Sequence, residues 1–348
     1  MPDRSITIGS SSLRTMTTAL DPSRLTMTEI IRLQTLLSQE LTRRFERNAA
    51  LAFTDVVDST AYFAQFGDEA GRRLQQLHFD LLERCLPSAD GRIVDTAGDG
   101  AFAAFASASA AASAMVALQN RVSLENVDRP RAHQLCLHIG LHWGPVLTDG
   151  AQVTGEAVNL CARLAATALP GQISMTRELL QQLDPDQRSQ CRSLGHVALK
   201  GITRSVESFA MLWRDPARFP SEVLIRETGQ RIVLPLHDVV GFGRGDTQDA
   251  ATPPDVPLVL PDALACKQIS RRQFELRSRA QGYVLKALSA QLTEVDGVSV
   301  AREQEVPIRP GSRVRVAGVM TLEFAAPSPA GQAAIDETVC GPGAVAIR

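Results

Sequence analysis

Residues 92–105 read RIVDTAGDGAFAAF and contain the pattern that decides the fold. Two strand-like halves flank the turn sequence AGDG, and Asp-Gly favours the tight turns of β-hairpins. The pattern therefore predicts two strands joined near Asp99. Upstream, residues 51–56 (LAFTDV) form an apolar run that predicts a buried strand, and Asp55 lies at its end.

The region around this hairpin, residues 49–213, alternates between two hydrophobic periods. Helical patterns alternate with strand-like runs, which predicts an α+β sandwich. The expected helices are 68–86, 107–124 and 156–168, and the further strands are 135–140, 172–175 and 206–212.

The segments before this region show less regular patterns. Residues 1–23 are rich in Ser and Thr, so we expect them to be disordered. Residues 24–48 place Ile and Leu at helical spacing, which predicts an amphipathic lead-in helix. Two interpretations of this helix remain open: it caps a core, or it mediates dimerisation.

The C-terminal part of the chain follows a different pattern. Residues 214–222 contain two prolines and are expected to form a linker. Residues 223–326 contain many short strand-like runs separated by turn residues, which predicts a small all-β sandwich. The Gly-, Ala- and Pro-rich residues 327–348 are expected to form a flexible tail.

The composition excludes several classes of protein. A formal net charge of −2 over 348 residues argues against nucleic acid as a partner. The six cysteines are scattered without a C-x-x-C pair, as expected for reduced thiols in the cytoplasm. The uncharged stretch 101–118 has a strand-like half and a helix-like half, so we predict no membrane insertion.

Asp55 and Asp99 are candidate metal ligands because both lie at the ends of expected strands. Hard cations prefer oxygen ligands, and two such cations could bridge phosphate oxygens and activate an attacking hydroxyl. The alternative is purely local, because Asp is common at strand ends and in Asp-Gly turns.

A second polar pair occurs in GEAVNLCARL, where Asn159 and Arg163 are four residues apart on one face of an expected helix. An amide and a guanidinium there could bind a sugar oxygen and a phosphate. The alternative is an ordinary exposed helix face.

Taken together, FTDVVDST, RIVDTAGDGAFAAF, IGLHWGPV, VTGEAVNLCARL with PGQI, and LKGI resemble the class III adenylyl/guanylyl cyclase catalytic domain. The resemblance covers residues 49–213 and implies a ferredoxin-like βαββαβ core. It also implies a head-to-tail homodimer with its active sites between the subunits.

The resemblance assigns roles to the two polar pairs. Asp55 and Asp99 of one subunit would hold two Mg²⁺ or Mn²⁺ ions per active site. Asn159 and Arg163 of the partner would position the ribose and stabilise the transition state, and Lys200 in LKGI would contact the triphosphate. The ribose 3′-hydroxyl would attack the α-phosphorus, releasing pyrophosphate and a 3′,5′-cyclic nucleotide.

The base-selecting positions depart from the family pattern. Asp95 stands where adenylyl cyclases have Lys and guanylyl cyclases have Glu, and Gln152 stands where they have Asp and Cys. An ionised carboxylate only accepts hydrogen bonds, which suits the N–H groups of guanine, whereas bacterial members of the family mostly use ATP. ATP and GTP both remain open, as does the alternative that Asp95 is a surface acid.

The β-rich part resembles a forkhead-associated (FHA) domain through FGRGD, ISRRQFEL and TEVDGVSV. Arg244 and Ser270 match the phosphate-contacting residues of that family, and Arg271 could assist them. Gln273 and Gln291 replace a family histidine and asparagine, which puts loop support and peptide contacts in question. The alternative is a structural or dimerising sandwich.

The resemblances support two hypotheses. The first is an active cyclase regulated or recruited through a phosphothreonine protein, for which Thr338 of the tail is an internal candidate. The second is a catalytically silent nucleotide-binding scaffold with a phosphopeptide-binding module. The chain keeps both acids and the Asn–Arg pair, which favours the enzyme.

Overall fold

The computed structural model describes residues 23, 25–245 and 253–326. The disorder predicted for the N-terminus falls almost wholly outside the described residues, and so do the predicted tail and Thr338. The chain divides into two compact units, 1–46 and 47–348, each described here by itself.

The described part of the first unit is helix α1 (Met27–Phe45). Thr26 caps it: its hydroxyl accepts from the backbone N–H of Glu29, whose carboxylate accepts from the backbone N–H of Thr26 at 2.8 Å. No residue of α1 is buried, and the role of capping a core stays a prediction for this helix. Dimerisation through its exposed apolar side chains stays a prediction. These side chains are Met27, Ile30, Ile31, Leu36, Leu37, Leu41 and Phe45.

The second unit begins with an eight-stranded sheet of order β2-β3-β1-β4-β6-β8-β7, with β5 paired to β4. Strands β1 to β4 and the helices α2 and α3 between them form the expected βαββαβ core, in which β1 and β3 run antiparallel. The bounds are β1 (Glu46–Val56), β2 (Gly91–Ala97), β3 (Gly100–Phe105), β4 (Leu137–Thr148), β5 (Val153–Thr154), β6 (Ile173–Thr176), β7 (Cys191–Val197) and β8 (Val206–Met211).

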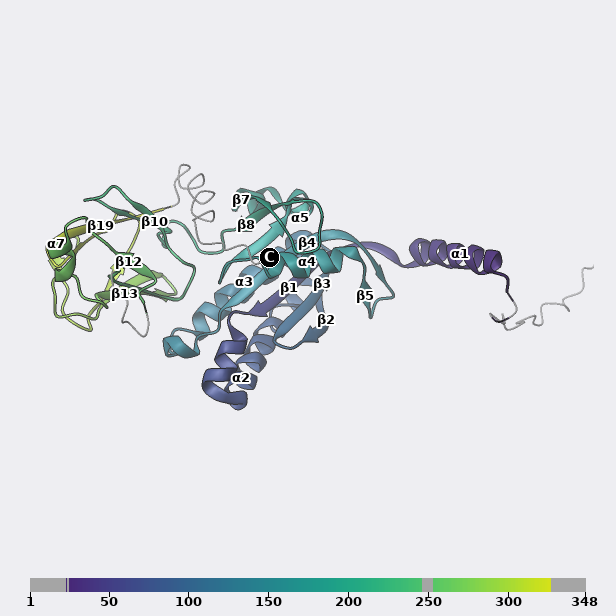
Figure 1. Cartoon of the computed structure of the whole chain (residues 1–348), viewed down its shortest axis with the longest axis horizontal. Helices are drawn as coiled ribbons and strands as arrows, with labels where there is room; N and C mark the ends of the chain where they lie inside the picture. Colours follow the sequence, from purple (N-terminus) through teal and green to yellow (C-terminus); the bar gives the residue numbers. More distant parts are fainter. Residues whose placement is uncertain (1–22, 24, 246–252, 327–348) are drawn as a thin grey trace, which may run out of the picture. The chain divides into compact units, whose positions relative to one another are not determined.

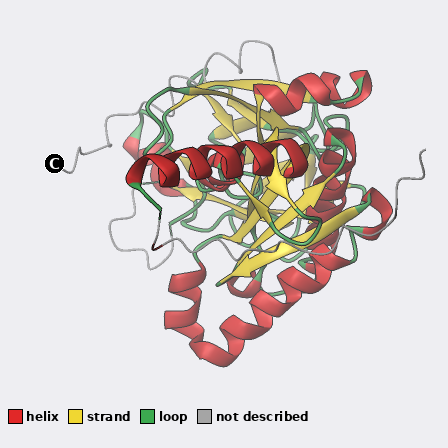
Figure 2. Ribbon diagram, turned by 90° about the vertical axis from the view of Figure 1, so that its right-hand side faces the viewer, coloured by secondary structure: helices red, strands yellow, loops and turns green. Residues whose placement is uncertain are grey.

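Helices cover both faces of this sheet (Figures 1 and 2). The alternation along β1 sets the two layers: Ala50 and Ala52 belong to the core under α2 and α3, whereas Leu51 packs with α4. The helices are α2 (Ser59–Glu83), α3 (Ala108–Glu125), α4 (Glu156–Ala165), α5 (Arg177–Gln182) and α6 (Pro185–Ser189), with short 3₁₀ turns at Pro87–Ala89 and Arg131–His133.

Several elements differ from the sequence-based expectations. Helix α2 begins at Ser59, well before the predicted start, and is interrupted at Gly67, whose φ of 83° breaks the helical pattern. Strand β4 continues beyond the predicted end to Thr148, and β7 was not predicted. A partly exposed strand such as β7 mixes polar and apolar residues and gives little hydrophobic signal.

The predicted β-sandwich is confirmed as two antiparallel-rich sheets of orders β10-β9-β19-β18-β15-β16 and β12-β11-β13-β14-β17. Its core includes the stacked rings of Phe242 and Phe274. The bounds are β9 (Glu222–Ile225), β10 (Arg231–Val233), β11 (Val239–Arg244), β12 (Val256–Leu258), α7 (Ala263–Gln268), β13 (Phe274–Arg279), β14 (Gly282–Ala287), β15 (Thr293–Val295), β16 (Val298–Ser299), β17 (Glu305–Ile308), β18 (Arg313–Val316) and β19 (Met320–Ala325).

The segment predicted to be a linker is anchored at its start. The Arg214 side chain is 7% exposed and lies 2.7 Å from the carboxylate of Asp238. That carboxylate also accepts from Asn126 Nδ2 at 2.7 Å and from Ser123 Oγ at 2.5 Å, both on or next to α3. Removing one partner of a buried ion pair leaves an uncompensated charge, so this network holds the sandwich against α3.

Within the described residues no helix is both long enough and apolar enough to cross a bilayer. The five cysteines of that part of the chain are all free thiols.

Candidate active site

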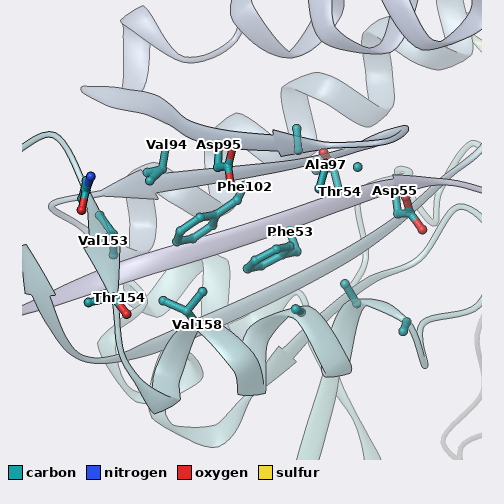
Figure 3. A pocket seen from close by; sticks show the side chains of 16 residues that line it. Phe53, Thr54, Asp55, Val94, Asp95, Ala97, Phe102, Val153, Thr154 and Val158 are labelled. Atoms are coloured by element: carbon teal, nitrogen blue, oxygen red, sulfur yellow. The ribbon is translucent and has the colours of Figure 1, made fainter. Parts of the chain in front are cut away.

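A pocket of about 660 Å³ lies between one face of the sheet and helix α4. The stacked rings of Phe53 and Phe102, with centroids 4.6 Å apart, form its middle. Figure 3 shows Asp55 at one end of the labelled side chains and Val153 at the other. The pocket therefore combines an acidic end with an apolar, ring-lined surface, as a nucleotide would require.

The two predicted metal ligands lie next to each other. Pairing of Thr54 with Ala101 sets the end of β1 beside the hairpin that carries Asp99. A Cβ atom at Gly100 would lie 3.2 Å from Asp55 Oδ1, so the Asp55 carboxyl group packs over the hairpin backbone. Partial burial of the Asp55 carboxyl group and the nearby Asp99 carboxylate both raise the pKa of Asp55. The two acids thus repel each other in the absence of a cation.

This acid pair fits a divalent cation. Asp99 Oδ2 is buried and has no hydrogen-bond partner among the described residues. A buried, unpaired carboxylate oxygen beside a second acid is the environment that Mg²⁺ or Mn²⁺ would stabilise. In the described part of the chain, no group of three or more His, Cys, Asp or Glu side chains is arranged to hold a metal ion. Further oxygen ligands would come from phosphate and water.

A buried histidine that the sequence reasoning missed connects the strands of the acid pair. His78 of α2 is fully buried, and its ring nitrogens lie 2.8 Å from Thr54 Oγ1 and 3.0 Å from the backbone oxygen of Asp99. A carbonyl only accepts, so Nδ1 must donate to Asp99 and Nε2 must accept from the Thr54 hydroxyl. The neutral ring therefore fixes the hairpin relative to β1.

We expect His78→Gln to make the free energy of unfolding depend less on pH in the acidic range. Burial lowers the pKa of His78 to about 4, whereas the same histidine in the unfolded chain has a pKa of about 6.5. Between these two pH values the unfolded chain binds a proton that the folded chain does not. The stability that comes from keeping His78 neutral is therefore complete above pH 6.5 and is lost as the pH falls toward 4. The wild type should lose about 2 kcal/mol more than the variant between pH 7.5 and 5 in urea unfolding. Parallel pH curves would contradict this role.

The second polar pair lies in a different cluster. Asn159 is exposed on α4, and Arg163 lies one turn further along. A Cβ atom at Gly201 would lie 2.7 Å from Arg163 Nη1, so the guanidinium packs against the LKGI backbone, where Gly201 adopts a φ of 73°. Leu199 packs under the same helix and brings the exposed Lys200 to this end of α4. None of the three predicted polar residues lines the pocket.

Both base-selecting positions line the pocket. Asp95 is exposed, and its carboxylate accepts from the backbone N–H of Thr96 at 2.8 Å. The Gln152 backbone N–H donates to Asp149, which leaves the Gln152 side chain at the pocket wall. The structure therefore brings Asp55, Asp95 and Gln152 into one pocket, and places Asn159, Arg163 and Lys200 in another cluster.

In the sandwich, the predicted phosphate-contacting residues come together at loop ends. The Arg244 backbone N–H donates to the Ser270 carbonyl at 2.9 Å, and Arg244 Nη1 donates to the carbonyl of Lys267 at 3.2 Å. Ser270 Oγ lies 2.6 Å from Ser289 Oγ, a neighbour that the sequence reasoning missed. Arg271 is exposed beside them.

Gln273 stands where the FHA family has a histidine, and its side chain supports the neighbouring loops. Its side chain is fully buried, and its carbonyl accepts from the backbone N–H of Ser270 at 3.0 Å. Its amide donates to the carbonyls of Gln291 and Leu292 and to Thr293 Oγ1. One amide therefore joins the Ser270 loop to the neighbouring loop.

Comparisons with known proteins agree with this division. The model of the adenylate and guanylate cyclase catalytic domain matches residues 42–212, and the model of the FHA domain matches residues 240–317. A Rhizobium meliloti protein named as a candidate adenylate cyclase 3 is 25% identical over 228 residues, which are 62% of this chain and 38% of that protein. An adenylate cyclase of Podospora anserina is 29% identical over 157 residues, 38% of this chain and 7% of that protein.

The chain thus spans well under half the length of these relatives. Among solved structures, an adenylate/guanylate cyclase/hydrolase from Silicibacter pomeroyi is 27% identical, with a TM-score of 0.42, covering 48% of this chain and 97% of that one. The chain belongs to the adenylate and guanylate cyclase catalytic domain family through residues 42–212, and an FHA domain follows in residues 240–317.

Proposed function

We propose that the chain is a nucleotide cyclase that converts a purine nucleoside triphosphate into a 3′,5′-cyclic nucleotide and pyrophosphate. The observation that carries this proposal is the adjacent pair of Asp55 and Asp99, with a buried carboxylate oxygen that lacks a partner among the described residues. Asp55 of this pair lines one end of a pocket large enough for a nucleotide.

The acid pair would hold two divalent cations, which when bound supply positive charge against the triphosphate and acidify the ribose 3′-hydroxyl. The residues of the chain do the positioning. Arg163 presents a guanidinium whose forked donors match phosphate oxygens, and Asn159 presents an amide for a sugar oxygen. Lys200 adds a charge for the leaving phosphates. The acids themselves orient the nucleotide by fixing its phosphate end.

A second copy of the chain completes the site in this proposal. Within one copy, Asp55 lines the pocket with Asp99 beside it, whereas Asn159, Arg163 and Lys200 lie in the separate cluster on α4 and the LKGI loop. A head-to-tail dimer would place the α4 cluster of one copy over the acids of the other, giving two equivalent sites. A twofold interface makes such exchange reciprocal.

The pocket wall bears on the choice between ATP and GTP. The Asp95 carboxylate only accepts, and the Gln152 amide can both donate and accept, which together complement the N–H groups and O6 of guanine. The Gln152 side-chain oxygen can also accept a hydrogen bond from the amino group of adenine. Both purines therefore stay candidates, and Asp95 is the residue that separates them.

The test is a set of assays with purified protein, Mg²⁺ or Mn²⁺, and ATP, GTP, CTP or UTP supplied separately. We expect a cyclic purine nucleotide and pyrophosphate in equal amounts. Asp95→Asn should lower GTP turnover more than ATP turnover if guanine is the natural base. Formation of nucleoside diphosphate and phosphate without a cyclic product would overturn the proposal and favour a hydrolase or a silent scaffold.

We further propose that the FHA domain binds a phosphothreonine peptide through Arg244, Ser270 and Arg271. The hydroxyl and the guanidinium converge at neighbouring loop ends that Gln273 holds in place. A doubly charged phosphate accepts several charge-assisted hydrogen bonds, which favours such a site. Binding would recruit the protein or tune its output.

Arg244→Ala should weaken binding of a phosphothreonine peptide about 10- to 100-fold, because charge-assisted hydrogen bonds are lost. Arg302→Ala, at an exposed position, is the matched control and should bind like the wild type. Affinity is measured by calorimetry with phosphorylated and unphosphorylated forms of one peptide library. Equal affinity of wild type and Arg244→Ala would show that the sandwich is structural.

A further inference from the structure

A second pocket, of about 440 Å³, lies between the cyclase domain and the start of the FHA domain. We call it the junction pocket; its walls come from residues 57–66, 119–126, 131–136, 170–171, Trp213 and 236–239. It shares no lining residue with the pocket that holds Asp55. Ligand sites occur preferentially at such domain boundaries.

One buried polar side chain in this pocket has a donor atom without a hydrogen-bond partner among the described residues. Gln119 of α3 is 2% exposed and lines the pocket, and its Nε2 has no hydrogen-bond partner among the described residues. A buried unpaired amide costs about 1–3 kcal/mol, so such groups in native proteins are normally satisfied. Asn126, the C-cap residue of α3, shows the contrast. Its amide donates to the Leu135 carbonyl and to Asp238, and its side-chain oxygen accepts from the Leu135 N–H.

Two aromatic side chains of the wall have their polar atoms bonded within the protein. Tyr62 and Phe66 lie 4.8 Å apart between ring centroids, and the Tyr62 hydroxyl lies 2.8 Å from His133 Nδ1. Trp213 Nε1 donates to the Gly171 carbonyl at 2.9 Å. The aromatic side chains therefore present apolar surface that suits a flat ring.

The charges around the pocket are largely paired within the protein. Arg131 pairs with Asp255, and Asp238 pairs with Arg214. Burial lowers the pKa of His237, which keeps its ring neutral at pH 7. Asp58 is exposed at the edge. The interior thus favours an uncharged occupant that accepts one hydrogen bond.

The junction pocket touches both functional parts of the chain. Val57 and Asp58 line it and follow directly after β1, which carries Asp55 and ends at Val56. The Val57 N–H donates to the Cys136 carbonyl at 2.9 Å. On the other side, Asp238 anchors the FHA domain to α3. An occupant would contact both the loop that follows Asp55 and the Asp238 side chain that anchors the FHA domain.

We propose that the junction pocket is a regulatory binding site for a neutral, planar aromatic compound that carries a hydrogen-bond acceptor, held by the Gln119 amide and the surrounding rings. Binding stabilises one arrangement of the loop after Asp55 and so changes the rate of the cyclase. Only this second effect rests on the proposed function, because binding can be measured without turnover.

The probes are 2-quinolone and naphthalene, which have similar shape but differ in the carbonyl acceptor. We expect 2-quinolone to bind the full chain with a Kd below about 1 mM and naphthalene to bind about tenfold more weakly, the difference that one hydrogen bond supplies. Binding is followed by ligand-observed NMR. Failure of 2-quinolone to bind, or equal binding of both probes, overturns the proposal.

Gln119→Leu removes the donor and keeps the volume. It should raise the melting temperature, because an unpaired buried amide disappears, and it should abolish the preference for 2-quinolone. Gln76→Leu, at an exposed position on α2, is the matched control. A lower melting temperature for Gln119→Leu, or an unchanged preference, would show that the amide has a structural role only.

A second variant keeps the proposal testable if Gln119→Leu fails to fold. Ala61→Phe places a ring in the pocket from an exposed position and should prevent binding of both probes. The turnover rate with saturating 2-quinolone should shift at least twofold in the wild type and not in Ala61→Phe. Binding without any shift overturns the regulatory effect, and absence of turnover in every sample contradicts the proposed function instead.

Discussion

Asp55→Ala should lower the rate of cyclic nucleotide formation about a thousandfold or more, because the variant loses a ligand for cations that supply several kcal/mol to the transition state. The fold should survive, since the carboxylate is exposed at the pocket edge and is repelled by Asp99. Initial rates with the preferred purine triphosphate and Mn²⁺ measure the effect.

Asp68→Ala is the matched control, because this exposed acid lies on α2 away from the hairpin. It should retain wild-type turnover. Thermal unfolding adds a second measurement: Mn²⁺ should raise the melting temperature of the wild type and of Asp68→Ala, and leave that of Asp55→Ala unchanged. Near-normal turnover of Asp55→Ala would remove the acid pair from the chemistry.

Gly140→Ala should destabilise the chain by about 3 kcal/mol and abolish turnover. A Cβ atom at this position of β4 would lie 2.5 Å from the backbone nitrogen and 2.7 Å from the Cα atom of Ala165. Backbone cannot move aside as a side chain can, so α4 must shift on the sheet. The shift displaces Asn159 and Arg163 as well. Urea unfolding and initial rates report the two effects.

Gly229→Ala is the matched control for this substitution. A Cβ atom there meets nothing within 4 Å, although the φ of 72° strains any other residue by about 1–2 kcal/mol. The variant should lose that much stability and keep its turnover. Wild-type stability of Gly140→Ala would mean that α4 does not pack on β4 as closely as described.

The elements that carry the site could be predicted because local signals specify them. The Asp-Gly turn gave the hairpin of Asp99, and the apolar run before Asp55 gave the central strand. Their adjacency follows once both strands belong to one sheet. The helix with Asn159 and Arg163 was similarly visible from its periodicity, and its start at Glu156 agrees with the prediction.

The supporting contacts could not be predicted, because they join residues far apart in the chain. His78 meets Thr54 and Asp99 across two different elements, and a lone histidine on an amphipathic helix gives no sign of this. The ion pair between Arg214 and Asp238 likewise depends on how the sandwich packs against α3. Gln273 is a further example, because an amide can take the place of a histidine only if hydrogen-bond partners lie within its reach. The sequence does not show where those partners lie.

The central claim is that acids from one copy and the α4 cluster from another form each active site, and mixing two inactive variants tests it most directly. Asp55→Ala and Arg163→Ala chains, each inactive alone, are unfolded together and refolded at equal concentration. Half of the resulting dimers should contain both chains, each with one intact site, so turnover should return to about a quarter of the wild type. No recovery, with mixed dimers demonstrated by two affinity tags, would contradict the shared site.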